Sequence, residues 1–345
     1  MSRNLTLDNL KGILIFFVVL GHVMSLGGDG YQNSLIFKVC YSFHMFMFMF
    51  MFISGYLIGH REHSTEWLKK RCTRLLVPFS IWGIFTLFFY NEIIYINDFA
   101  KLFTEPVLWY LTVLYMCDIV LVCSDKISSF MAKKWIDYKI CTIIVFSVFF
   151  LASNIVCVLG FDEYHFKMMT IYYPFYFAGQ YFYKFPIEIS LNKYIFIAAW
   201  YPLSMLFYGF QDRSDEGETL GSLLSFVGVD TTFIEWIMNN FNGIGGVMYN
   251  HFIVAPLGCV FIYLVSLVIM RVDSLKNLFI YIGRYTLQIY ILAAFFQKAY
   301  TGNIIIDYGL SLFLGITISI VIGIFISRFH LLNSLLFGSR AHFCL

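Results

Sequence analysis

The chain has 345 residues, of which 60% are hydrophobic and only 13% are charged. This composition is typical of polytopic membrane proteins and excludes a soluble domain with a large core. The net charge of +2 provides no strongly basic surface, so no nucleic-acid partner is expected. We therefore predict an all-α, polytopic bundle of transmembrane helices that forms a single domain over residues 1–345.

Ten apolar runs follow one another along the chain, most of them close to the roughly 20 residues that a helix needs to cross a bilayer. They lie at 10–26, 35–59, 75–92, 107–123, 140–159, 168–183, 194–210, 246–270, 278–299 and 308–327. The fourth and sixth runs are the weakest, because they carry Asp118 and Gln180. The pattern predicts about ten spans, which places both termini on one side of the membrane.

The basic residues predict which side that is. If the termini are cytoplasmic, all but five of the 23 Lys and Arg residues fall on the cytoplasmic side or at the inner helix edges. The positive-inside rule therefore predicts a multi-pass protein of the cytoplasmic (inner) membrane with both termini in the cytoplasm. The external segment 211–245 carries six acidic residues against one Arg, and we expect either a functional lid or a solvated loop.

The first run carries two polar residues on one helix face. Lys11 and His22 are 11 residues apart, which places them on the same side of a helix and about 16 Å apart. This face suits a ligand that enters from the cytoplasm with an anionic tail and a reactive tip, with His22 as a base. Two simpler interpretations stay open: His22 as a hydrogen-bonded packing residue, and Lys11 as a charged anchor at the membrane edge.

The second run contains SFHMFMFMFMFISGY (42–56), in which Met and Phe alternate. Because both alternating residues are apolar, there is no polar face, and the stretch predicts a transmembrane helix rather than a strand. His44 lies about as deep as His22, so the two imidazoles could line one cavity. Asp118 could orient one of them, or it could form a buried pair with a Tyr or a backbone group.

Five segments, in this order along the chain, resemble segments of the acyltransferase-3 family of integral-membrane acyltransferases. They are LDNLKGILIFFVVLGHV (7–23), SFHMFMFMFMFISGYLIG (42–59), KKRCTRLLVPFSIWG (69–83), LWYLTVLY (108–115) and IGRYTLQIYIL (282–292). Lys11 and His22 stand where the family has an Arg and a His with ten residues between them. The chain departs from the family pattern in three places: Lys11 replaces the Arg, the Pro of the second segment is missing, and Ala293 or Ala294 replaces a late His.

The resemblance implies an enzyme, a membrane-bound O-acyltransferase. It implies transfer of an acyl group, usually acetyl from acetyl-CoA, to a hydroxyl of a surface polysaccharide or of its lipid-linked precursor. The expected catalytic residues are His22, as base or transient acyl carrier, with help from His44 and Asp118.

The same resemblance implies a cationic site for the phosphates of acetyl-CoA at the cytoplasmic face, formed by Lys11, Arg71 and Arg74. Four further residues could line the pocket or bind the acceptor, with ordinary packing as the alternative: Ser54, Tyr56, Trp109 and Tyr290. No metal and no tightly bound cofactor are expected, since acetyl-CoA is a substrate.

Two other functions stay open at this point. A proton-coupled transporter or flippase of a glycan lipid would use the central His and Asp residues as proton carriers. A catalytically inactive scaffold of glycan assembly would fit the departures from the family pattern. The sequence specifies neither the acceptor sugar nor the oligomeric state.

Overall fold

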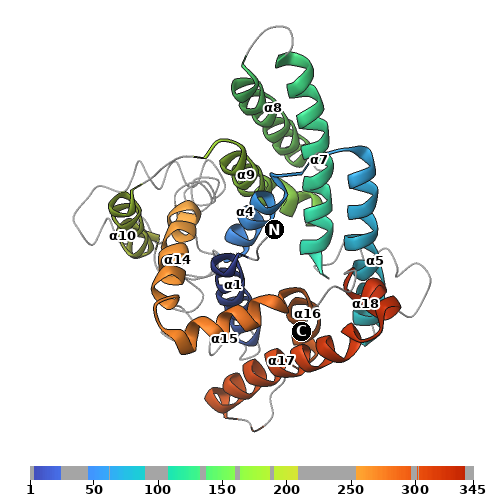
Figure 1. The fold of residues 1–345 in the computed structure, drawn as a ribbon, viewed down its shortest axis with the longest axis vertical. Coiled ribbons are helices and arrows are strands. Elements are labelled where there is room, and N and C mark those ends of the chain that lie inside the picture. The colour runs from blue at the N-terminus through green and yellow to red at the C-terminus, as the bar shows by residue number, and fades with distance from the viewer. Residues whose placement is uncertain are drawn as a thin grey trace. The chain divides into compact units, whose positions relative to one another are not determined.

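The computed structural model describes residues 4–24, 46–61, 63–89, 108–132, 137–159, 164–186, 190–208, 254–296, 301 and 303–338 (Figure 1). Almost all of these residues are helical, and none of them is in a β-strand. The predicted all-α class is therefore confirmed for the described part of the chain. His44 and the acidic segment 211–245 lie outside it.

A helix overlaps each of the ten predicted apolar runs. The helices are α1 (Leu5–Met24), α4 (Phe46–Ile58), α5 (Thr65–Phe89), α7 (Trp109–Ala132), α8 (Tyr138–Val158), α9 (Tyr164–Lys184), α10 (Leu191–Tyr208), α14 (Ala255–Ile269), α15 (Asp273–Arg284), α16 (Thr286–Leu292), the 3₁₀ turn η5 (Ala293–Phe296), α17 (Ile304–Ser327) and α18 (His330–Phe337). Within the described residues, α1, α5, α8 and α17 are long and apolar enough to cross a membrane, and the bent pair α15–α16 makes a fifth if it counts as one span. The count of about ten spans stays a prediction.

Two helices extend well beyond the predicted apolar runs. α5 begins at Thr65 rather than near 75, and α7 continues to Ala132 rather than ending near 123. Long basic and polar side chains are good helix formers, and neither extension contains a Gly or Pro that would end the helix. As a result, Arg71 and Arg74 lie on α5, ahead of the predicted apolar run 75–92.

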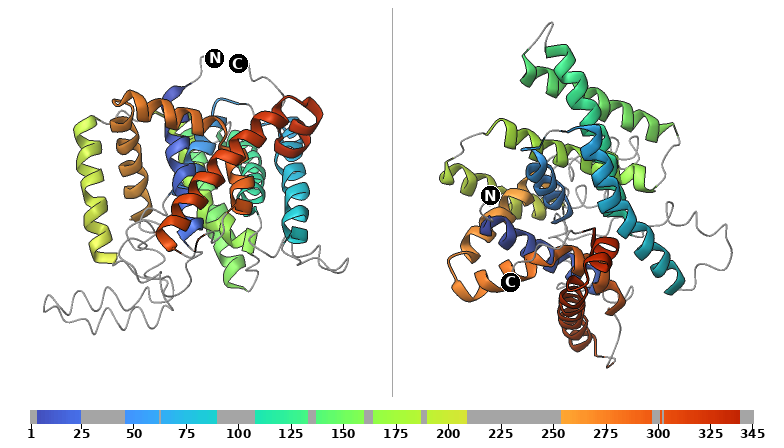
Figure 2. Two further views of the ribbon diagram at one scale, coloured as in Figure 1. Left: turned by 90° about the horizontal axis from the view of Figure 1, so that it is seen from below. Right: turned by 45° about the vertical axis from the view of Figure 1, so that its right-hand side comes forward.

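The ninth run is broken. The predicted continuous helix over 278–299 is wrong, because α15 and α16 meet at Tyr285 with a bend of 68°. Tyr285 has φ −108° and ψ 21°, which interrupts the helical backbone there. Figure 2 (left) shows α15 lying across the ends of α1 and α14 rather than alongside them.

The chain forms two compact units, which are described separately. Unit 1 comprises Met1–Phe50 and Ile187–Ile320, and unit 2 comprises Met51–Pro186 and Val321–Leu345. Helices α4 and α17 contribute residues to both units.

In unit 1, α1 packs against α14, α15 and α16, and α10 packs against α14. The crossing of α1 and α15 is very close, because two glycines face each other's backbone. A Cβ atom at Gly12 would lie 1.9 Å from the carbonyl oxygen of Phe279, and one at Gly283 would lie 1.9 Å from that of Asp8. Small residues at such a crossing are how membrane helices approach without a gap.

In unit 2, α7 packs against α5, α8 and α9, and α18 packs against α5. A second glycine pair joins α4 to α9. A Cβ atom at Gly55 would lie 1.9 Å from the carbonyl oxygen of Tyr176, and one at Gly179 would lie 1.9 Å from that of Phe52. This contact places Tyr176 and Gly179 of α9 next to the second half of α4, while α9 also packs against α7.

Candidate functional site

In unit 1, the candidate residues of the first run lie on one unbroken helix. α1 extends from Leu5 to Met24, so Lys11 and His22 share a face of it. Lys11 Nζ lies 2.8 Å from Oδ1 of Asp8, whose side chain is almost fully buried. The lysine is held in place by this ion pair, and its charge is partly compensated. His22 lies in the last turn of α1 and is exposed.

In unit 2, Asp118 is fully buried and has two partners. Arg71 Nε donates to Asp118 Oδ2 at 2.7 Å, and the Tyr176 hydroxyl donates to Oδ1. The buried charge is thereby paired and both oxygens accept a hydrogen bond, as a carboxylate in apolar surroundings requires. Asp118 and Arg71, which were predicted separately as a catalytic and a donor-binding residue, are in direct contact. His22 belongs to unit 1, so its orientation by Asp118 stays a prediction.

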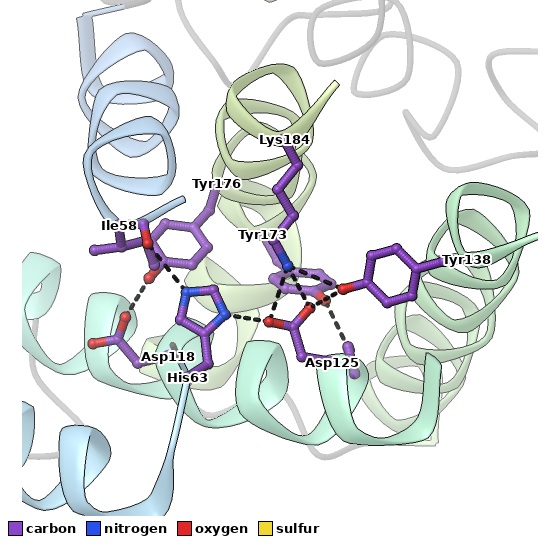
Figure 3. Close-up of polar contacts among 9 residues, drawn as sticks. Ile58, His63, Asp118, Asp125, Tyr138, Tyr173, Tyr176 and Lys184 are labelled. Atoms are coloured by element: carbon purple, nitrogen blue, oxygen red, sulfur yellow. Dashed lines mark hydrogen bonds and ion pairs between the residues drawn. The ribbon is translucent and has the colours of Figure 1, made fainter. Parts of the chain in front are cut away.

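A second carboxylate, the half-buried Asp125, lies two turns further along α7 (Figure 3). His63 Nδ1 bonds Asp125 Oδ2, and Lys184 Nζ lies 3.0 Å from Oδ1. The Tyr138 hydroxyl, 3.2 Å from Oδ1, donates as well and lies 3.1 Å from Lys184 Nζ. Asp125 therefore joins residues from α8, α9 and the segment before α5.

His63 has a polar neighbour at each ring nitrogen. Its Nε2 lies 3.2 Å from the carbonyl oxygen of Ile58, and its Nδ1 faces the carboxylate of Asp125. Both neighbours are oxygen acceptors, so the ring is held between the end of α4 and Asp125. Asp125 lies beyond the predicted span 107–123. Burial alone would raise its pKa, but the hydrogen bond from His63 and the charge of Lys184 lower it below the ordinary value.

The two carboxylates form two layers between α5 and α7. Asp118 and Asp125 are seven residues apart on α7, which is about two turns. Their partners Arg71 and His63 are eight residues apart, with Arg71 on α5 and His63 two residues before α5 begins. We call these contacts the Asp118 layer and the Asp125 layer. Sequence reasoning missed the second layer, because Asp125 and His63 lie outside the predicted apolar runs. The spacing of seven between two acids was the signal that could have revealed it.

Two of the predicted pocket residues lie on α4 and have partners in unit 2. The Ser54 hydroxyl lies 2.8 Å from that of Tyr110 on α7. The Tyr56 ring packs edge-on against Tyr183 of α9, with ring centroids 5.3 Å apart. Both contacts fit a packing role, and a role in binding the acceptor stays a prediction.

The remaining predicted residues are spread over both units. Trp109, in unit 2, stacks on Tyr172 with ring centroids 5.1 Å apart. Arg74 is exposed on α5. Tyr290 is half-buried in α16 of unit 1. The structure thus brings two of the predicted site residues, Asp118 and Arg71, into direct contact. Ser54, Tyr56 and Trp109 instead contact residues that were not predicted for the site.

Comparison with known families identifies the family to which the chain belongs. The acyltransferase-3 family model, described as an acyltransferase domain, matches residues 4–328. The chain therefore belongs to the acyltransferase-3 family, and its apolar helices make it a membrane protein. The match extends through both units and includes every predicted site residue.

Two relatives share a shorter stretch with the chain, and both are named nodulation protein NolL. The one from Sinorhizobium fredii is 40% identical over 88 residues, which is 24% of this chain and 24% of that protein. The one from Mesorhizobium japonicum is 36% identical over 88 residues, which is 24% of this chain and 23% of that protein. The matched stretch spans about a quarter of each relative's length. No solved structure matches the chain.

Proposed function

We propose that this protein transfers an acyl group, acetyl from cytoplasmic acetyl-CoA, to a hydroxyl of a cell-surface or lipid-linked carbohydrate. The observation that carries the proposal is the family match over residues 4–328, together with Lys11 and His22 on one face of α1. The protein would work as a multi-pass protein of the cytoplasmic membrane, where the donor meets one face and the glycan the other. The acceptor class is supported by the resemblance to members that modify surface glycans.

The donor would be held by cations that are already fixed in place. Lys11 is oriented by Asp8 and Arg71 by Asp118, which lowers the entropy lost when either side chain binds a phosphate. Only Nε of Arg71 bonds Asp118, so its remaining N–H groups can reach an anionic oxygen. Arg74, one turn further along α5, would add a third cation.

His22 would supply the proton transfer. As a neutral imidazole it takes the proton of the acceptor hydroxyl while that oxygen attacks the acetyl carbonyl carbon. The carbon–sulfur bond then breaks, and the CoA thiolate leaves and takes up the proton from His22. In a two-step alternative, His22 carries the acetyl group briefly before the hydroxyl attacks. His44 and Asp118 would support this residue or help to bind the acceptor.

Replacing His22 tests the assignment directly. We expect His22→Ala to reduce acetyl transfer by about 10²–10⁴-fold, because the base is lost, while expression is unchanged. Acetyl transfer from radiolabelled acetyl-CoA to membrane glycan measures it. The exposed His60 is the control, and His60→Ala is expected to retain activity. A fully active His22→Ala variant would contradict the assignment of His22 as the catalytic residue.

A second experiment distinguishes the proposed enzyme from a transporter and from an inactive scaffold. The purified protein is tested for acetyl-CoA binding and for slow acetyl-CoA hydrolysis. An enzyme shows both, a transporter neither, and an inactive scaffold at most binding. Analysis of O-acetylation in the surface glycan of a deletion strain then identifies the acceptor.

A further inference from the structure

Unit 2 contains buried polar atoms without a hydrogen-bond partner in the described part of the chain. Among them are Nε1 of Trp67 and both side-chain polar atoms of Gln180, Oε1 and Nε2. Gln180 is fully buried. These atoms belong to neither the Asp118 layer nor the Asp125 layer.

Trp67 lies between the two layers on α5. It is four residues after His63, which precedes α5, and four residues before Arg71, so it lies in the first turn of α5 between these two residues of the chain. Its ring centroid is 5.3 Å from that of His63, and Cζ of Arg71 lies 5.7 Å from the Trp67 ring. The indole ring therefore packs against both His63 and the cation that is expected to bind a phosphate.

Gln180 occupies the corresponding position on α9. It is four residues after Tyr176, which reaches Asp118, and four residues before Lys184, which reaches Asp125. The helical register therefore places Gln180, like Trp67, at the level between the two layers. The close contact of α9 with α4 at Gly179 keeps this part of α9 fixed.

Unpaired polar groups are costly in a buried position, at roughly tenfold or more in the folding equilibrium for each group. A leucine at position 180 would avoid this cost, so the amide is expected to serve a partner that arrives after folding. The set consists of two donors, Trp67 Nε1 and Gln180 Nε2, and one acceptor, Gln180 Oε1. A phosphate offers acceptors only and would leave Oε1 unpaired. A chain with secondary amides offers both C=O acceptors and N–H donors.

We propose that Trp67 and Gln180 bind the amide groups of the pantetheine arm of the acyl-CoA donor. The inference rests on the proposed function, in which acyl-CoA is the donor and Arg71 binds its phosphates. Pantetheine carries two secondary amides, so one carbonyl can accept from Trp67 Nε1 and another from Gln180 Nε2. An amide N–H can donate to Gln180 Oε1. These two residues thereby determine that the donor is a CoA thioester rather than another acylated nucleotide.

The test uses Trp67→Phe and Gln180→Leu in the full-length protein, reconstituted in lipid nanodiscs, with three ligands. Acetyl-pantetheine has the amides without the phosphates, adenosine 3′,5′-bisphosphate has phosphates without the amides, and acetyl-CoA has both. Each variant is expected to bind acetyl-pantetheine and acetyl-CoA about tenfold more weakly and the bisphosphate equally well. Gln180→Leu is also expected to raise the melting temperature of the ligand-free protein, since it removes two unpaired atoms.

Trp82→Phe is the matched control on the same helix. Trp82 Nε1 donates to the carbonyl oxygen of Leu336 at 2.8 Å, so this substitution removes a bond that already exists. It is expected to lower the melting temperature and to leave all three affinities unchanged.

Several results would overturn the inference. Unchanged affinity of both variants for acetyl-pantetheine would mean that the site holds ordered water only. Equally weakened binding of all three ligands would indicate a general loss of structure and would overturn the inference. If Gln180→Leu does not fold, the affinities of Trp67→Phe alone test the inference. A wild-type protein that binds neither acetyl-CoA nor acetyl-pantetheine contradicts the proposed function as well. Wild-type binding with unaffected variants contradicts only the role of Trp67 and Gln180.

Discussion

Two carboxylates of unit 2, the fully buried Asp118 and the half-buried Asp125, are compensated by a cation from another part of the chain. Arg71 pairs with Asp118, and Lys184 pairs with Asp125, which also bonds His63. Removing one member of such a pair costs more than the pair contributes, because the remaining charge stays buried. At the scale of single residues, these pairs hold the cations of α5 in fixed positions.

The two polar contacts of His63 lead to a first residue-scale prediction. His63→Phe keeps a planar ring but removes both ring nitrogens, so the Ile58 carbonyl and Asp125 each lose a partner. We expect a loss of about 3 kcal/mol in the free energy of unfolding, measured by thermal denaturation in detergent. His60→Phe, at an exposed position three residues earlier, is the control. A loss below about 0.5 kcal/mol for His63→Phe would contradict the assigned bonds.

Lys11 leads to a second residue-scale prediction. Lys11→Glu replaces the cation next to Asp8 by an anion, so we expect KM for acetyl-CoA to rise roughly tenfold. Lys11→Arg keeps the charge and adds a planar donor fork, so KM is expected to stay or to fall. Lys193→Glu, at an exposed position of α10, controls for the change in net charge. An unchanged KM in Lys11→Glu would show that Lys11 does not bind the donor.

At the scale of elements, two glycine crossings determine which helices approach most closely. Gly12 and Gly283 join α1 to α15, and Gly55 and Gly179 join α4 to α9. In each case the atom that a Cβ would meet belongs to the backbone, which cannot rotate away as a side chain can. The first crossing lies next to Lys11 and so positions a candidate site residue.

The α1–α15 crossing leads to an element-scale prediction. Gly12→Ala is expected to cost about 3 kcal/mol or more, because α1 and α15 must move apart to admit the methyl group. Gly309→Ala in α17 is the matched control, since a Cβ there meets nothing within 4 Å. It is expected to stabilise by up to about 1 kcal/mol through its better helix propensity. Equal melting temperatures for the two variants would contradict the close crossing.

The helix bounds show where sequence reasoning works at this scale. A helix overlaps every predicted apolar run, because the local density of apolar side chains is sufficient to indicate one. The first turns of α5 and the last turns of α7 were missed, because their charged and polar residues lie outside the apolar runs. The break at Tyr285 was missed too, because the residues on both sides of it are apolar.

At the scale of the whole molecule, the main prediction concerns the topology. An even number of spans with the basic residues inside places both termini in the cytoplasm. Epitope tags at either end are therefore expected to resist protease added to intact cells and to be cleaved after permeabilisation. Cleavage of one tag in intact cells would mean an odd number of spans, and cleavage of both would mean the opposite orientation.

The sequence by itself determined that this is an all-helical membrane protein and, through short segments around Lys11 and His22, that it resembles the acyltransferase-3 family. The family match over residues 4–328 confirmed that resemblance. These properties depend on composition and on the spacing of residues within one helix, so they can be inferred from the local sequence.

Only the tertiary structure decided that Asp118 bonds Arg71 and Tyr176, and that Asp125 and His63 form a second layer. It also decided that Gln180, visible in the sequence only as a weakness of the sixth run, is a buried amide without a partner in the described residues. The physical reason is that a buried charge or amide is satisfied by whichever helix lies opposite it. The choice of that helix depends on long-range packing at positions such as Gly55 and Gly179, which no local pattern encodes.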